Sequence, residues 1–257
     1  MRHELKYLVP ESDREWVHER LAPFVRSDPH AAGDARKAYV VRSIYFDTPG
    51  LKDFVEKQDG ILRRRKLRIR GYGPEYPETP VFLEVKHKNE ARVWKDRIPL
   101  PARTAVGLIR GATPQPMHSR VDAQALDRFL YWMRREARKA VMLVTYDREP
   151  LVGRFDPSLR VTFDRHLRCA PYPELGPDLE GLYTDDLNPI LRRHFILEVK
   201  FDRVFPSWLR SILAERSYPR RALSKYVISL LSVARGSPWR YRGGPAVRAL
   251  AGLVQPS

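Results

Sequence analysis

Basic side chains recur at every second position in one short stretch of the chain. If residues 62–70 form a β-strand, their side chains alternate between its two faces. This alternation places four bases on one face: Arg64, Lys66, Arg68 and Arg70. The apolar residues between them fall on the other face. Arginine can grip phosphate oxygens with two donors, so this face is suited to a phosphate-rich ligand, although a solvated surface strand would show the same pattern.

Three other strand-like stretches carry an acid and a base two residues apart. The pairs are Glu4 and Lys6, Glu84 and Lys86, and Glu198 and Lys200. Bases that point into a confined space repel one another unless carboxylates or a bound anion compensate them. Carboxylates also suit Mg²⁺ or Mn²⁺. Strands of this kind around one hollow would suit di-, tri- or polyphosphate, with metal and arginines neutralising the charge of phosphoryl transfer.

The chain predicts mostly strands, with amphipathic helices between them. Strands are expected at residues 3–9, 39–47, 62–70, 81–88, 92–100, 141–148, 160–168 and 194–202, with a possible further strand at 151–155. Helices are expected after a capping box at residues 12–15, and at 51–57, 102–109, 121–136, 207–215 and from 224 onward. Residues 171–189 are expected to form an irregular loop.

No linker divides the strands into two sets, and the first and last strands share the same Glu-x-Lys pattern. We therefore expect one α+β domain over residues 1–235. It is an antiparallel β-barrel with a charged interior, and helices cover its apolar outer face. Residues 236–257 form a basic C-terminal tail.

Composition indicates an anionic partner. The 257-residue chain has 47 Lys and Arg against 31 Asp and Glu, a formal charge of +16. Phosphate compounds, nucleic acid and a membrane surface all fit such a charge. No apolar run approaches the roughly 18–20 residues of a membrane span. The N-terminus has no signal-like apolar core, and Cys169 is the single cysteine. A cytoplasmic protein is therefore expected.

Six short motifs follow one another along the chain. They are Arg2-x-Glu4-x-Lys6-Tyr7, Tyr45-Phe46-Asp47-Thr48, Lys66-Leu67-Arg68-Ile69-Arg70, Glu84-Val85-Lys86, Leu197-Glu198-Val199-Lys200 and Ser224-Lys225-Tyr226. In this order they resemble the VTC domain, the polyphosphate polymerase branch of the triphosphate tunnel metalloenzymes. The resemblance implies an antiparallel tunnel barrel with flanking helices. It also implies metal-dependent transfer of the terminal phosphoryl group of ATP to a growing polyphosphate chain, with release of ADP.

The resemblance also assigns roles to residues. The catalytic set that it implies is Lys6, Arg68, Arg70, Lys86 and Lys225. The substrate-binding set is Lys95, Tyr146, Arg148, Arg160 and Ser224. The ligands of a divalent metal, Mn²⁺ or Mg²⁺, would be Glu198 and, second, Glu4. The Ser-Lys pair would meet phosphate at the start of a helix, where the helix dipole favours anions.

Two positions depart from the family pattern. The wider superfamily opens with Glu-x-Glu-x-Lys, but Arg2 replaces the first acid. This points away from the adenylate cyclase and thiamine triphosphatase branch. Fungal polymerases carry a lysine just before the Ser-Lys pair, where this chain has Ala222 preceded by Arg220 and Arg221. Phosphate binding is therefore better supported than polymerase activity.

Two alternative functions remain open at this point. A hydrolase of triphosphates or RNA 5′-ends would use the same tunnel, and a non-enzymatic module would bind polyphosphate or nucleic acid. Base-reading motifs of nucleic-acid binders are missing from the sequence. Several charged residues are expected to be structural instead. Arg63, Arg65, Lys88 and Lys200 are predicted at the outer surface, and Asp47 is predicted to form a turn.

Overall fold

The computed structural model describes residues 3–31, 37–73, 80–90, 92–114 and 119–235. The described strands are β1 (His3–Pro10), β2 (Val25–Ser27), β3 (Tyr39–Asp47), β4 (Arg63–Tyr72), β5 (Val81–Asn89), β6 (Arg92–Leu100), β7 (Lys139–Gly153), β8 (Arg160–Pro171), β9 (Asn188–Pro189) and β10 (His194–Phe201). The described helices are α1 (Arg14–Leu21), α2 (Lys52–Gln58), α3 (Ala102–Ile109), α4 (Arg120–Arg135), α5 (Ser207–Glu215) and α6 (Lys225–Arg235).

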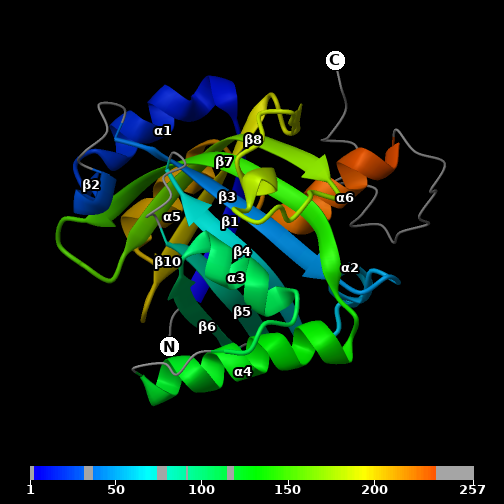
Figure 1. The fold of residues 1–257 in the computed structure, drawn as a ribbon. Helices are drawn as coiled ribbons and strands as arrows, with labels where there is room; N and C mark the ends of the chain where they lie inside the picture. The colour runs from blue at the N-terminus through cyan, green and yellow to red at the C-terminus, as the bar shows by residue number, and fades with distance from the viewer. Residues whose placement is uncertain (1–2, 32–36, 74–79, 91, 115–118, 236–257) are drawn as a thin grey trace.

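All of these strands belong to one antiparallel sheet. Its order is β1-β10-β8-β7-β3-β4-β5-β6, with β2 added to β7 and β9 added to β8. The sheet curls into a half-barrel (Figure 1). In the described part of the chain no hydrogen-bonded ladder joins β1 to β6. The predicted antiparallel α+β fold is confirmed, with a barrel wall that is open between these two strands.

The outer face of the sheet is apolar and covered by helices. Leu67 and Ile69 of β4 are fully buried with the α4 residue Phe129, as the alternation in β4 predicts. At the other end of the sheet, Phe163 and Leu197 pack with residues of α1 and α5. Full burial stabilises each such side chain by about 1.5–3 kcal/mol. Figure 1 shows α3 and α4 against β5 and β6, and α1 at the opposite side of the molecule.

Helix α6 packs differently, because it lies against the side of β7 and β8 that also borders the charged interior. Tyr226, Val227 and Ile228 are buried in a cluster that includes Tyr45 and Tyr146 of the sheet. This packing brings the N-terminal end of α6 to the interior of the half-barrel. The first residues of that helix are therefore in a position to contact a bound ligand.

Some local predictions are wrong. The proposed capping box is a 3₁₀ turn (Glu11–Asp13), and α1 begins after it without a side-chain cap. The separate strand at 151–155 does not form, because β7 continues to Gly153 and pairs with β2. The loop at 171–189 holds a short 3₁₀ helix (Glu180–Leu182) and β9. The predicted tail at 236–257 lies outside the described residues. In the part of the chain described here, no helix has the length and apolar character of a membrane span.

Candidate functional site

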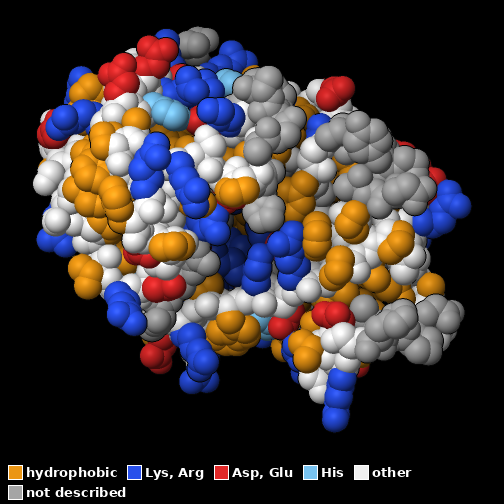
Figure 2. Space-filling model, turned by 90° about the vertical axis from the view of Figure 1, so that its left-hand side faces the viewer, with side chains coloured by type: hydrophobic (Ala, Val, Ile, Leu, Met, Phe, Trp, Pro, Cys, Tyr) orange, Lys and Arg blue, Asp and Glu red, His pale blue; other side chains and the backbone are white. Residues whose placement is uncertain are grey.

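The inner side of the half-barrel encloses a cavity of about 510 Å³. Figure 2 shows a hollow in the molecular surface with Lys and Arg side chains gathered in it. Ten of the twelve residues predicted for the site line this cavity. They are Glu4, Lys6, Arg68, Arg70, Lys86, Tyr146, Arg148, Glu198, Ser224 and Lys225.

Strand β4 supplies the floor of the cavity with two arginines that neighbouring strands hold in place. The Nε of Arg70 donates to Ser43 Oγ at 3.0 Å, and its Nη2 lies 3.5 Å from the hydroxyl of Tyr146. The Nη1 of Arg68 donates to the hydroxyl of Tyr45 at 3.1 Å. Burial alone would raise the pKa of Tyr45, but Arg68 and Arg70 lower it to about 7. The phenol responds in this way to the strong positive potential of the floor.

A buried carboxylate lies beside these arginines. Glu84 on β5 is fully buried and accepts hydrogen bonds from Arg68, Nε at 2.7 Å and Nη2 at 2.5 Å. Lys95 and Arg97 of β6 approach the same carboxylate at 3.4 and 3.5 Å. Burial would raise the pKa of Glu84, but Arg68 and Arg70 hold it well below the usual range. The sequence pattern placed Glu84 on the charged face of its strand. It did not predict that Glu84 orients Arg68.

The wall formed by β1 and β10 carries acids and bases in alternation. The Nζ of Lys6 lies 2.9 Å from Glu4 and 3.3 Å from Glu198, and the Nζ of Lys200 lies 2.5 Å from Glu198. Burial would raise both carboxyl pKa values. The pKa of Glu4 instead falls to about 2, chiefly because of Lys6, and Lys6 and Lys200 hold that of Glu198 well below its usual range. Lys86 of β5 reaches Glu4 at 3.5 Å. This ion pair spans the gap between the two sides of the open barrel.

The two carboxylates on this wall fit a divalent metal of the magnesium type. Such ions are held by one or two protein carboxylates and complete their coordination with water and phosphate oxygens. Glu4 and Glu198 are both ionised and share Lys6 as a neighbour, so they lie close together at the cavity. Among the described residues, no group of three or more His, Cys, Asp or Glu meets at one point. The donor set therefore fits a metal bound jointly by protein and phosphate.

Next to this wall, on the strand that pairs with β10, a second buried acid orients two bases. Asp164 on β8 accepts two hydrogen bonds from the Arg148 guanidinium, both at 2.7 Å, and one from Lys225 Nζ at 2.5 Å. Burial would raise the pKa of Asp164, but Arg148 and Lys225 lower it. The Nζ of Lys225 also lies 4.4 Å from the ring centre of Tyr146. The role of Asp164 was not predicted, although it follows two residues after Thr162 on the charged face of its strand.

Lys66 is a further lining residue that the predicted site omits. Its Nζ donates to Ser224 Oγ at 2.9 Å and lies 5.2 Å from the ring centre of Tyr226. Burial lowers the pKa of Lys66 to about 8. Just before this Ser-Lys pair, the backbone N–H of Arg221 donates to the carbonyl of Lys6 at 2.9 Å. The chain that leads into α6 is thus attached to the free edge of β1.

The model of one protein family, described as the VTC domain, matches residues 1–234. The chain belongs to the VTC domain family. No match was found among curated proteins. Among solved structures, a putative adenylate cyclase from Bacillus halodurans is 16% identical with a TM-score of 0.47, and the match covers 86% of this chain and 92% of that one.

Two other solved structures also resemble this chain. A putative adenylyl cyclase from Hippeastrum, described as having a dominant triphosphatase activity, is 13% identical with a TM-score of 0.45, over 95% of this VTC domain and 100% of that chain. A Mimivirus capping enzyme triphosphatase is 9% identical with a TM-score of 0.29, over 83% of this chain and 86% of that one.

Two predicted residues do not line the cavity of this VTC domain. Lys95 lies on the inner face but binds Glu84, and Arg160 forms an ion pair with Asp28. In the other direction, three residues predicted at the outer surface line the cavity instead: Arg65, Lys88 and Lys200. Arg63 is exposed as predicted, with its Nε 3.2 Å from Asn89. Arg220 and Arg221, noted beside the family's missing lysine, also line the cavity.

Proposed function

We propose that this VTC domain is a divalent-metal-dependent polyphosphate polymerase. It would transfer the γ-phosphoryl group of ATP to a growing polyphosphate chain and release ADP. The charge of the cavity carries the proposal. Among the described residues, fourteen Lys or Arg side chains and two Glu side chains line it. So many like charges in one hollow repel one another, and a polyanion supplies the compensation that the protein lacks.

The arginines whose orientation is fixed by hydrogen bonds to neighbouring side chains are the groups best placed to bind phosphate oxygens. Arg68, Arg70 and Arg148 are each oriented by a neighbouring acid, hydroxyl or both. Because their orientation is fixed before a ligand arrives, little side-chain entropy is lost on binding. Lys6, Lys86 and Lys225 add positive charge around the same space. These groups would stabilise the charge of the transferring phosphoryl group.

A divalent metal bound by Glu198 and Glu4 would neutralise phosphate charge and help to align the reacting oxygens. The transfer forms a bond from the γ-phosphorus to a terminal oxygen of the acceptor chain. It breaks the bond to the bridging oxygen, which leaves with ADP. Ser224 and Lys225, at the start of α6, would hold one phosphate of this pair of substrates.

The proposal is tested by incubating the purified protein with γ-labelled ATP and Mn²⁺ and separating the products. Long-chain polyphosphate with ADP is the expected result. Labelled orthophosphate alone would indicate a triphosphatase, and binding without turnover would indicate a phosphate-binding module. Arg70→Ala should abolish product formation, whereas Arg63→Ala, an exposed base on the same strand, should leave it unchanged.

A further inference from the structure

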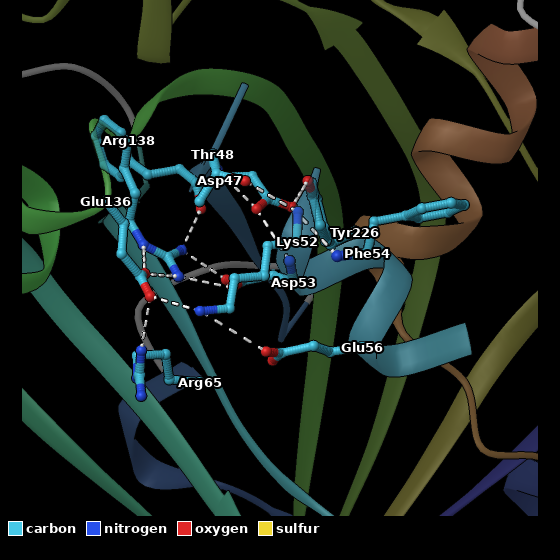
Figure 3. A network of polar contacts seen from close by, with 11 residues as sticks. Asp47, Thr48, Lys52, Asp53, Phe54, Glu56, Arg65, Glu136, Arg138 and Tyr226 are labelled. Atoms are coloured by element: carbon cyan, nitrogen blue, oxygen red, sulfur yellow. Dashed lines mark hydrogen bonds and ion pairs between the residues drawn. The ribbon is translucent and has the colours of Figure 1, made fainter. Parts of the chain in front are cut away.

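Asp47 lies at the end of β3 and is fully buried. Its Oδ1 accepts from the backbone N–H of Thr48 at 2.7 Å and of Asp53 at 3.0 Å. Its Oδ2 accepts from the backbone N–H of Phe54 at 3.2 Å and from the hydroxyl of Tyr226 at 2.6 Å (Figure 3). The predicted turn-forming residue is therefore a junction between β3, α2 and α6.

Tyr226 is the partner of Asp47 on α6, and it directly follows Lys225 in the chain. Its ring stacks on Tyr45 of β3, with 5.1 Å between ring centres and 24° between planes. Burial and the Asp47 carboxylate raise the pKa of Tyr226 far above its usual value, so the hydroxyl keeps its proton and donates to Asp47. Tyr226 does not line the cavity. Its contacts with Asp47 and Tyr45 join α6 to β3.

A second tier of ion pairs holds α2, whose amides Asp47 binds. Arg138, the residue just before β7, donates two hydrogen bonds of 2.7 Å to the Asp53 carboxylate. Glu136 accepts from Lys52 at 2.8 Å and from Arg65 at 3.0 Å (Figure 3). The side chains of Arg138 and Asp53 are almost completely buried. This arrangement holds α2, whose amides at Asp53 and Phe54 orient the Asp47 carboxylate that accepts from the Tyr226 hydroxyl.

We propose that Asp47 and Tyr226 are positioning residues for the phosphate site. Their hydrogen bond fixes the rotation of the first turn of α6, so that Ser224 and Lys225 face the cavity. A rotated α6 would move Lys225 away from Asp164 and Ser224 away from Lys66. The inference rests on the proposed function, because it concerns how Ser224 and Lys225 are oriented in the same cavity to bind a polyanion.

The test measures tripolyphosphate binding by calorimetry in Tyr226→Phe, which keeps the ring contacts and removes the hydroxyl. The matched control is Tyr218→Phe, because the Tyr218 hydroxyl donates to Asp13 at 2.7 Å away from the cavity. Tyr226→Phe should weaken binding about fivefold, which corresponds to about 1 kcal/mol, the typical net contribution of one hydrogen bond. Asp47→Asn should weaken it at least as much, and the control should bind as the wild type does.

A double-mutant cycle separates positioning from general destabilisation. In a background with Ser224→Ala and Lys225→Ala, Tyr226→Phe should change the affinity by less than about twofold, because the groups that it positions are gone. A fivefold loss in both backgrounds, or wild-type binding by Tyr226→Phe, overturns the inference. A wild-type protein that binds no tripolyphosphate overturns the proposed function as well. Binding in the expected pattern without turnover supports the inference and overturns only the polymerase activity.

Discussion

Replacing Glu84 by glutamine removes the buried negative charge beneath the floor of the cavity. Arg68 donates to this carboxylate through two nitrogens, and Lys95 and Arg97 lie within 3.5 Å of it. The Glu84→Gln side chain keeps its size but presents an amide to the guanidinium. Arg68, of which only 15% is exposed, then lacks its counter-charge. Removing one member of a buried ion pair costs about 3–5 kcal/mol.

The dependence of this effect on pH follows from the pKa of Glu84. The pKa is depressed in the folded protein, so the ionised carboxylate contributes stability above the unfolded-state value of about 4.3. That contribution is lost as the pH falls through the folded-state pKa. The wild type and Glu84→Gln should therefore differ most near pH 7. Their difference in the free energy of unfolding should shrink on acidification.

Urea denaturation followed by circular dichroism measures this difference. At pH 7 the free energy of unfolding of Glu84→Gln should be about 3 kcal/mol lower than that of the wild type. Glu215→Gln is the control, because Glu215 pairs with Arg20 at the surface and both side chains are more than 40% exposed. An exposed pair of this kind contributes about 1 kcal/mol or less. If Glu84→Gln loses no more stability than the control, the reasoning about the buried ion pair is refuted.

Three further predictions concern charge in and near the cavity. Burial lowers the pKa values of Lys66 and Lys86 to about 8, so both lose their protons as the pH rises from 7 to 9. The affinity for tripolyphosphate, measured by calorimetry at each pH, should fall over this range. Glu198→Gln should abolish the response of activity to Mn²⁺ titration, and an unchanged response would exclude a ligand role. Arg138→Met leaves Asp53 buried without its partner, so the free energy of unfolding from urea titration should fall by about 3 kcal/mol.

The inner face of the charged strands was largely predictable from the sequence, because side-chain alternation is fixed by the backbone; Arg65, Lys88 and Lys200 are the exceptions. On β4 the alternation alone placed Arg68 and Arg70 in the cavity and Leu67 and Ile69 in the core. The same rule placed Glu198 on the inner face, because its neighbours on β10 are apolar. The side of the sheet on which a residue lies depends on its own strand alone, so it could be inferred without knowing the fold.

The partners of these residues could not be inferred, because they depend on the register between strands. Arg68 meets Glu84 only because β4 and β5 pair in that register, and Arg148 meets Asp164 through β7 and β8. The position of a residue along its strand also decides which partner its side chain meets. Arg160 shares a face with Asp164 but lies near Asp28, which takes its charge outside the cavity. Alternation gives the side of a sheet, and register decides which acid a base meets.

The acids of the inner face fall into two kinds: those that orient arginines and those that line the cavity. This division explains how the protein tolerates so many bases in one cavity and still attracts anions. Glu84 and Asp164 are fully buried beside arginines, where they hold guanidinium groups in fixed orientations. Glu4 and Glu198 lie at the cavity itself and neutralise only the lysines next to them. Among the described residues, the bases that line the cavity still outnumber the lining acids, fourteen to two. A ligand that adds negative charge relieves this repulsion without breaking the ion pairs that keep the arginines in place.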